Sequence, residues 1–286
     1  MKIGIVGLGL IGGSLGRTIV KNTKDEVFAL DVSNKAMLDG RLLNAYHFQL
    51  SEKDFLDLDI LFLSIYPKAT ITALEEYVLK LKKGAIVIDL CGNKRAVVEK
   101  MRELSKKYPH ITFIGGHPMA GREFSGVSHS TVNLFDKASM IMVPVNAELK
   151  TLAFIKEYFI NLGFLKVVIT SAENHDKIIA FTSQLAHVIS SAYARSETAS
   201  EHLGFSAGSF RDMTRVARLS PEMWTELMIG NSDFLAKEIE QLITHLNEYK
   251  TALENKDEKF LKEILADGNN KKILYEKLKR IKNYEN

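Results

Sequence analysis

The chain has 286 residues, of which 46% are hydrophobic, and a formal net charge of +3 at pH 7. This length allows one large or two medium domains with ample apolar material for a core. Acidic and basic residues are mixed along the sequence, which argues against a nucleic-acid-binding groove, and no apolar run is long enough to span a membrane. The single cysteine, Cys91, excludes an internal disulfide framework and indicates a reducing, cytoplasmic setting.

The first 31 residues predict a strand, a glycine-rich turn, a helix and a second strand. A short apolar run at 2–6 leads into the turn at 7–12. A helical segment follows, and a second apolar run at 27–30 ends at Asp31. A dinucleotide site requires this order of elements.

Each glycine of the turn has a separate role. Gly7 permits the tight turn, Gly9 lets the backbone approach a pyrophosphate, and Gly12 lets the helix pack close to the strand. The helix N-terminus then presents free N–H groups and a partial positive charge to the phosphates. We therefore assign cofactor binding to the whole turn, Gly7, Leu8, Gly9, Leu10, Ile11 and Gly12.

Asp31 indicates which dinucleotide the site prefers. A carboxylate at the tip of the second strand accepts hydrogen bonds from a ribose 2′-OH and repels a 2′-phosphate. The residues at 32–34 include no arginine that could bind that phosphate, and Lys35 is the nearby cation. The sequence therefore predicts NAD as the cofactor in preference to NADP.

Short apolar runs continue to alternate with amphipathic stretches as far as residue 169. We expect further strands at 58–63, 85–89, 111–114, 139–143 and 166–169. We expect helices at 34–43, 67–81, 94–108 and 148–162. Alternating strands and helices predict a parallel, doubly wound sheet, so residues 1–169 are expected to form a Rossmann-like NAD-binding domain.

Strand patterns stop near Thr170, and only helices are expected beyond it. Their predicted positions are 174–196, 221–229, 234–255 and 259–282. A sheet followed only by helices indicates two domains, so residues 170–286 are assigned to an all-α substrate-binding and dimerisation domain. The helix at 174–196 is apolar on most faces and must be buried. It packs either in the core of this domain alone or also against a second subunit, and the sequence leaves both possibilities open.

Ligands of open α/β sheets bind outside the carboxyl ends of the strands. Three stretches are expected there, at 63–67, 89–94 and 115–126, and Ser64 in the first is assigned to the cofactor site. His117 follows a predicted strand, has glycines before it and precedes a proline. A histidine beside a nicotinamide can bind a substrate hydroxyl and take its proton as hydride leaves. Glu123 is close enough in sequence to orient His117 or a water molecule.

The helical half offers a histidine and several arginines. His187 is either a core histidine or a site residue. Three arginines at 211, 215 and 218 lie near glycines, and arginine is suited to a bidentate grip on a substrate carboxylate. The pattern alone does not choose among the three. Cys91 has no adjacent base and is interpreted as a packing residue rather than a nucleophile.

Four segments are more specific than the glycine turn alone. They are GLGLIGGS at 7–14, GGHPMAGREFSG at 115–126, HDKIIAFTSQLAH at 175–187, and SFRDMTRVA at 209–217 with PEMW at 221–224. Together they resemble the prephenate dehydrogenase family of tyrosine biosynthesis, which includes arogenate dehydrogenases. The resemblance covers essentially the whole chain.

The resemblance implies an oxidoreductase that carries out NAD-dependent oxidative decarboxylation of prephenate to 4-hydroxyphenylpyruvate. His117 matches the catalytic histidine that binds the ring hydroxyl, and Glu123 matches an acid near the pocket mouth. Arg215 matches the arginine that holds a substrate carboxylate, and Asp212 is expected to position it. His187 matches a residue that lines the substrate pocket, where tyrosine can inhibit. A cytoplasmic homodimer is implied, with no metal, nucleic acid or membrane among its partners.

The chain departs from the family pattern at two places that matter for the site. Many members have a serine at the position of Gly92 that would bond the catalytic histidine, so we expect water or the backbone to orient His117 here. Many also have a histidine at the position of Gln184 and a proline at that of Ala186. Gln184 is assigned to substrate binding, but it leaves open whether the substrate side chain is the ketone of prephenate or the amine of arogenate.

Two further hypotheses share the predicted layout. A β-hydroxyacid dehydrogenase or imine reductase relies on a catalytic lysine in the helical domain. The candidates Lys150, Lys156 and Lys177 lack the expected glycine setting, and this hypothesis does not explain the loop at 117–121. A NAD-sensing binding protein would bind NAD without turnover and would not need His117.

Overall fold

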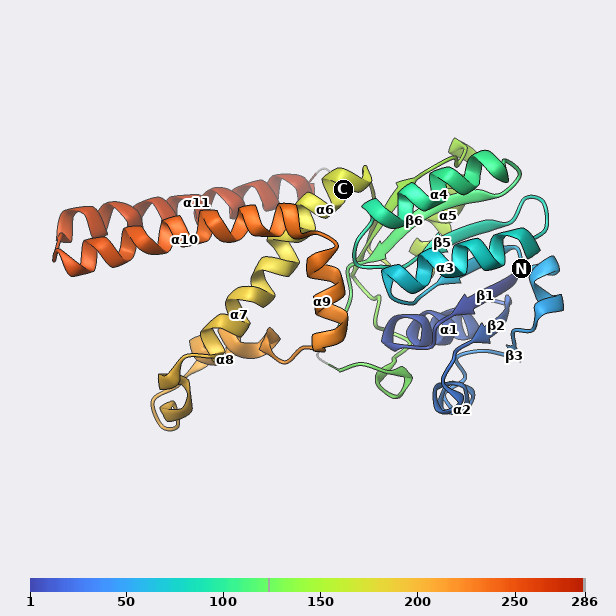
Figure 1. The fold of residues 1–286 in the computed structure, drawn as a ribbon, viewed down its shortest axis with the longest axis horizontal. Helices are drawn as coiled ribbons and strands as arrows, with labels where there is room; N and C mark the ends of the chain where they lie inside the picture. Colours follow the sequence, from blue (N-terminus) through green and yellow to red (C-terminus); the bar gives the residue numbers. More distant parts are fainter. Residues whose placement is uncertain (123, 285–286) are drawn as a thin grey trace. The chain divides into compact units, whose positions relative to one another are not determined.

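Within residues 1–122 and 124–284, which the computed structural model describes, eight strands form one sheet in the order β3-β2-β1-β4-β5-β6-β7-β8 (Figure 1). The strands are β1 (Lys2–Val6), β2 (Glu26–Leu30), β3 (Phe48–Gln49), β4 (Ile60–Leu63), β5 (Ile86–Asp89), β6 (Thr112–Pro118), β7 (Ser139–Pro144) and β8 (Lys166–Ile169). The helices among them are α1 (Leu10–Asn22), α2 (Asn34–Leu42), α3 (Pro67–Tyr77), α4 (Arg95–Lys107) and α5 (Leu149–Asn161). Those after β8 are α6 (Ala172–Ile179), α7 (Ala186–Ala194), α8 (Gly208–Thr214), α9 (Pro221–Ile229), α10 (Ser232–Glu254) and α11 (Glu258–Tyr284).

The predicted α/β class is confirmed, with one correction to the direction of the strands. β7 runs antiparallel to β6 and parallel to β8. The described part of the connection between β6 and β7 holds only a short 3₁₀ turn, Val127–His129, and no crossover helix, and an antiparallel neighbour needs none. β6 also extends through Pro118, so His117 lies within a strand, opposite Ile141, rather than after it. The sequence does not predict β3 or α8, because neither is long enough to show a period.

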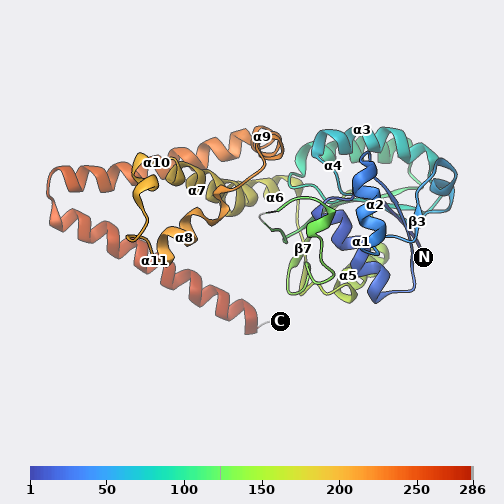
Figure 2. The same cartoon turned by 90° about the horizontal axis from the view of Figure 1, so that it is seen from below.

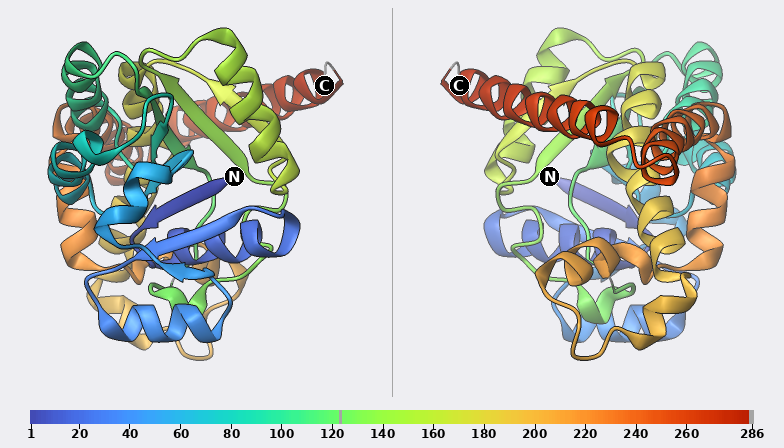
Figure 3. Two further views of the ribbon diagram at one scale, coloured as in Figure 1. Left: turned by 90° about the vertical axis from the view of Figure 1, so that its right-hand side faces the viewer. Right: turned by 90° about the vertical axis from the view of Figure 1, so that its left-hand side faces the viewer.

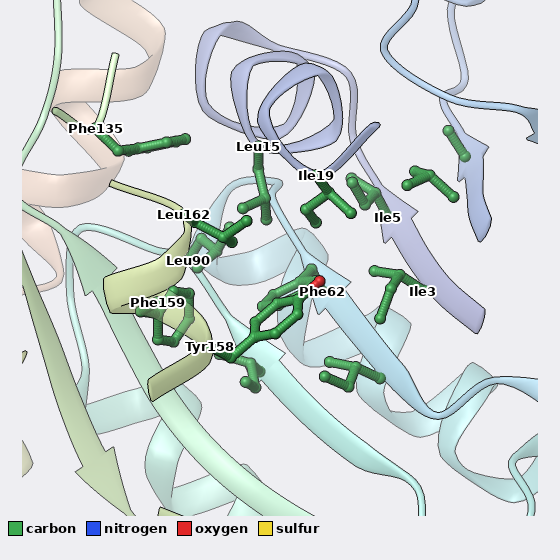
Figure 4. Close-up of a cluster of buried hydrophobic side chains, with 14 of the residues drawn as sticks. Ile3, Ile5, Leu15, Ile19, Phe62, Leu90, Phe135, Tyr158, Phe159 and Leu162 are labelled. Carbon is green, nitrogen blue, oxygen red and sulfur yellow. The ribbon is translucent and has the colours of Figure 1, made fainter. Parts of the chain in front are cut away.

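Helices cover both faces of the sheet, α1 and α5 on one and α3 and α4 on the other (Figures 2 and 3). Figure 4 shows the first face, where side chains of α1 and α5 meet those of β1 and β4: Leu15, Ile19, Tyr158, Phe159, Ile3, Ile5 and Phe62. Burying one such side chain contributes about 1.5–3 kcal/mol. This packing holds α1, which follows the glycine turn, tightly against the sheet.

β1 and β4 lie where the chain changes direction across the sheet. From β1 the chain continues to β2 and β3 on one side, and from β4 to β5 and β6 on the other. The backbone N–H of Ser64 donates to the carbonyl oxygen of Val6 at 2.7 Å, so the loops after β1 and β4 lie side by side. Open α/β sheets bind ligands at such a switch point.

The glycine turn occupies this point, and two of its glycines are required sterically. Gly7 has φ +95°, and a Cβ there would lie 2.4 Å from the backbone oxygen of Ser64. A Cβ on Gly12 would lie 1.9 Å from the backbone oxygen of Gly7. The predicted roles of Gly7 in the tight turn and of Gly12 in close helix packing therefore have a direct geometric cause.

After β8 the chain is helical, as expected, and α6 runs through a π-helical turn, Ala180–Leu185, into α7. The sequence predicts this stretch as one helix buried on most faces. In the single chain, however, Ile178 is 48%, Phe181 58% and Tyr193 47% exposed. The apolar surface of this helix is therefore not covered fully within one subunit.

The contacts of the chain group it into two units, Met1–Ser232 and Asp233–Asn286. The first unit contains the sheet together with α6 to α9, and the second contains α11 and almost all of α10. The predicted division into 1–169 and 170–286 remains a prediction. Among the described residues, no helix is both long and apolar enough to cross a membrane.

Gly12→Ala should destabilise the fold, because its methyl group would collide with the backbone of Gly7. We expect a loss of about 1–3 kcal/mol in the free energy of unfolding, measured by urea denaturation without cofactor. Gly9→Ala is the matched control, because nothing lies within 4 Å of a Cβ at that position. Equal stability of the two variants would contradict the packing role given to Gly12.

Candidate active site

A cavity of about 730 Å³ lies at the carboxyl ends of the strands, within the first unit of the chain. Its walls come from the glycine turn, the segments that follow β4 and β5, the end of β6 and the loop after it, and residues between 179 and 227. The predicted site residues that line it are Gly9, Leu10, Ile11, Ser64, His117, Gln184, His187 and Arg215. The structure thus brings cofactor and substrate candidates to one cavity.

Five other predicted residues that the structure describes do not line the cavity: Gly7, Leu8, Gly12, Asp31 and Asp212. Asp31 holds the turn in place, because its carboxylate accepts hydrogen bonds from the N–H groups of Leu8 at 2.7 Å and Ser33 at 2.8 Å. Asp212 is exposed, and its recorded ion pair is with Arg211, at 3.6 Å, so its predicted role at Arg215 remains a prediction. Glu123 lies outside the described residues.

The N-terminus of α1 can hold the phosphates of a dinucleotide. Its N-cap is Gly9, and no side chain caps the helix. The first N–H groups of a helix lack partners within the helix and carry partial positive charge. A Cβ on Gly9 would meet nothing within 4 Å, so a ligand can approach the backbone there. The residues present therefore fit a pyrophosphate at this turn.

His117 lies half-buried on the cavity wall. Its Nδ1 atom is 2.8 Å from Nε2 of His175, and the two ring centroids are 5.1 Å apart. Burial, with the nearby His175 and the cation of Lys94, lowers the pKa of His117 well below its usual value. The imidazole is therefore neutral near pH 7 and can accept a proton.

His175 and Asp176 continue this contact towards the start of α4. His175 Nδ1 lies 2.7 Å from Asp176 Oδ1, and both side chains are fully buried. The backbone N–H groups of Lys94 and Arg95 donate to the same carboxylate at 2.8 and 2.9 Å. Burial alone would raise the pKa of Asp176, but these donors outweigh it and lower that pKa, so the group is ionised. The group that contacts His117 Nδ1 is therefore the side chain of His175, whereas the sequence-based expectation was water or the backbone.

A buried ion pair lies next to this chain of side chains. The ammonium group of Lys94 bonds the carboxylate of Asp89, and neither side chain is exposed. Asp89 also accepts hydrogen bonds from the N–H of Cys91 at 2.9 Å and of Gly116 at 3.3 Å. Burial strongly raises the pKa of the Cys91 thiol, which fits a packing residue and not a nucleophile.

Another part of the cavity wall is built around the π-helical turn. His187 Nδ1 lies 2.9 Å from the carbonyl oxygen of Ser183, and its ring lies over Trp224 with centroids 3.8 Å apart. Burial is the main cause that lowers the pKa of His187, and the charge of Arg215 adds to it. π-Helical turns occur frequently at functional sites, and this one shapes the wall that carries His187.

Gln184 lines the cavity, but its amide is used inside the protein. The NH₂ group lies 3.2 Å from Asn93 Oδ1 and 3.2 Å from the carbonyl oxygen of Leu227. Its oxygen accepts a hydrogen bond from Asn231 at 2.8 Å. These contacts join α9 to the π-helical turn. The expected binding of the substrate by Gln184 remains a prediction.

Sequence reasoning missed three groups at the site: His175, Asp176 and the Asp89–Lys94 pair. All lie in the segments 89–94 and 175–187 that the sequence analysis named. A local sequence pattern, however, gives no distance between His117 and a residue 58 positions away. The available clue was a histidine and an aspartate next to each other at the start of an apolar helix. No group of three or more potential metal ligands occurs among residues 1–122 and 124–284.

Two family models match the chain. "Prephenate dehydrogenase, nucleotide-binding domain" matches residues 15–168, and "Prephenate dehydrogenase, dimerization domain" matches residues 171–267. A prephenate dehydrogenase of Lactococcus lactis subsp. cremoris is 30% identical over 279 residues, which cover 93% of this chain and 75% of that protein.

Solved structures agree with these matches. Arogenate dehydrogenase of Synechocystis is 26% identical with a TM-score of 0.79, over 96% of this chain and 100% of that one. Prephenate dehydrogenase of A. aeolicus, in complex with hydroxyphenyl propionate and NAD⁺, is 25% identical with a TM-score of 0.82, over 96% of this chain and 98% of that one.

Lys94→Met should be strongly destabilising, because it leaves the carboxylate of Asp89 buried without its cation. Removing one partner of a buried ion pair costs about 3–5 kcal/mol, which denaturant unfolding would measure. Lys35→Met is the control, because it removes an exposed partner of Asp39 by the same chemical change and should leave stability close to that of the wild type. A similar small effect in both variants would show that the buried pair is dispensable.

Proposed function

Because the chain belongs to the prephenate dehydrogenase family, we propose that it catalyses the NAD-dependent oxidative decarboxylation of prephenate to 4-hydroxyphenylpyruvate. The products on this proposal are 4-hydroxyphenylpyruvate, CO₂ and NADH. The observation that carries the proposal is a neutral, half-buried His117 in the same cavity as the uncapped end of α1 and Arg215.

On this proposal, different residues of the cavity bind the cofactor, accept the hydroxyl proton and bind a substrate carboxylate. The N–H groups at the start of α1 bind the pyrophosphate, and NAD, when bound, supplies the acceptor for the hydride. His117 accepts the proton of the ring hydroxyl, so that a carbonyl can form at that carbon. Arg215 binds a substrate carboxylate. Loss of CO₂ then moves the bonding electrons through the ring to the carbonyl oxygen, which takes the proton back from His117, and the ring becomes aromatic.

Arogenate is the second candidate substrate, and one observation favours it. The partner of His187 Nδ1 is a carbonyl oxygen, which can only accept, so Nδ1 must hold the proton. The lowered pKa of His187 then leaves Nε2 without a proton, as an acceptor. An acceptor on the cavity wall suits the ammonium group of arogenate better than the ketone of prephenate.

We propose a second copy of this chain as the macromolecular partner, in the cytoplasm. The matched family model is a dimerization domain, and the exposed apolar side chains of α6, the π-helical turn and α7 (Ile178, Phe181 and Tyr193) supply surface for such a contact. Tyrosine, which shares the hydroxyphenyl ring of the product, is the inhibitor that we expect at this cavity.

The direct test is NADH absorbance with purified protein, NAD and either prephenate or arogenate. We expect turnover, and the ratio of kcat/KM values identifies the preferred substrate. His117→Asn should lower kcat by about 10²–10⁴-fold with little change in NAD affinity, because it removes the base and leaves the glycine turn unchanged. NAD binding without turnover of either substrate would contradict the proposal, and full activity of His117→Asn would contradict the role of His117.

The pH dependence of kcat/KM should report the lowered pKa of His117 in the free enzyme. Protonation removes the lone pair that accepts the hydroxyl proton, so kcat/KM falls as pH decreases through this pKa. Because burial holds the pKa well below 6.5, the fall should begin below pH 6.5 and kcat/KM should be flat between there and pH 7.5. Activity regained on return to pH 7.5 controls for unfolding. A midpoint at or above pH 6.5 would show that His117 is not desolvated as described.

A further inference from the structure

We propose that His175 and Asp176 are positioning residues that fix which nitrogen of His117 holds the proton, leaving Nε2 as the free base. The catalytic consequence of this inference rests on the proposed function. The order of the protons itself does not, because it follows from the hydrogen-bond partners and from the burial that keeps both imidazole rings neutral.

The order starts at Asp176, an ionised carboxylate that can only accept hydrogen bonds. Its Oδ1 atom accepts from the backbone N–H of Lys94. Its Oδ2 atom accepts from two groups of Arg95, the backbone N–H at 2.9 Å and the side-chain Nε at 3.3 Å. The remaining contact of Oδ1, at 2.7 Å, is with Nδ1 of His175. Nδ1 of His175 must therefore hold a proton and donate it.

The state of His175 then decides the state of His117. Burial is the main cause that lowers the pKa of His175, so its ring is neutral and holds one proton, on Nδ1. Its Nε2 atom can only accept, and the atom 2.8 Å away is Nδ1 of His117. His117 must donate from Nδ1, and as a neutral ring it has no proton on Nε2.

This order suits a general base. If His117 held its proton on Nε2, that atom could not take a proton from a substrate hydroxyl. With the proton on Nδ1, the hydroxyl proton moves to Nε2, and His117 becomes an imidazolium whose Nδ1–H still donates to His175. No proton needs to move on to Asp176, whose carboxylate keeps its hydrogen bond with His175.

Position 92 offers no competing partner for His117. Gly92 lines the cavity but has no side chain, and a Cβ there would lie 3.1 Å from Cδ2 of Leu227. In this chain His175, near the start of α6, therefore orients His117.

His175→Met removes the acceptor behind His117, and we expect kcat to fall by about 10²-fold while KM and NAD affinity change little. His110→Met makes the same chemical change at an exposed histidine and should keep wild-type kcat. His175→Gln can place an amide oxygen near the original Nε2 position and should recover part of the loss. A kcat for folded His175→Met within twofold of the His110→Met value would overturn the proposal.

Two-bond ¹H–¹⁵N correlation spectra of histidine-labelled wild-type protein test the proton order without turnover. The signal of His117, assigned by its loss in His117→Asn, should show a proton on Nδ1 and a bare Nε2. A proton on Nε2 at pH 7.5 would overturn the inference even if the substitutions at position 175 fail to fold. A proton on Nδ1 together with no turnover of either substrate would instead contradict the proposed function alone.

Discussion

The buried carboxylate of Asp176 is the constraint on which the arrangement of the site depends. A charge without exposure costs several kcal/mol unless donors surround it, and here two backbone N–H groups, an arginine and a histidine do so. The two N–H groups begin α4, where the helix dipole also favours a negative charge. Asp176 therefore fixes the start of α6 against α4. The residue beside it, His175, is placed next to His117 as a consequence.

Polar contacts extend this constraint along the cavity wall. Asn231 donates to the backbone oxygen of Asp176 and to Gln184, both at distances below 3 Å. Gln184 and Asn93 in turn bond the carbonyl oxygen of Leu227 on α9. Buried hydrogen bonds thus help to hold α6, the π-helical turn and α9 in register, and breaking one leaves a polar group unpaired in the interior. Ile178, Phe181 and Tyr193 on the same helical stretch remain exposed.

The sequence predicts the geometry of the glycine turn well and the hydrogen bonds behind His117 poorly. Gly7, Gly12 and Asp31 act within one strand-turn-helix-strand unit, so their spacing carries their geometry. His117 and His175 meet across 58 positions, and no local period encodes that contact. The antiparallel β7 was missed for a related reason, because apolar alternation shows a strand but not its direction. Exposure of Phe181 could not be foreseen either, since an apolar helix face looks alike whether its own domain or another subunit covers it.

Two histidines reach the same protonation state in the cavity by different means. His117 holds its proton on Nδ1 because His175 and Asp176 accept from that side, and His187 does so because Ser183 presents a carbonyl oxygen. Burial lowers the pKa of both rings, so each has an unprotonated Nε2. Arg215 is a cation in the same cavity. Two histidine acceptors and three arginines, Arg122, Arg215 and Arg218, thus line the same cavity. A substrate that carries both hydrogen-bond donors and a carboxylate can pair with groups of both kinds, whereas a ligand that offers only acceptors leaves both histidines unpaired.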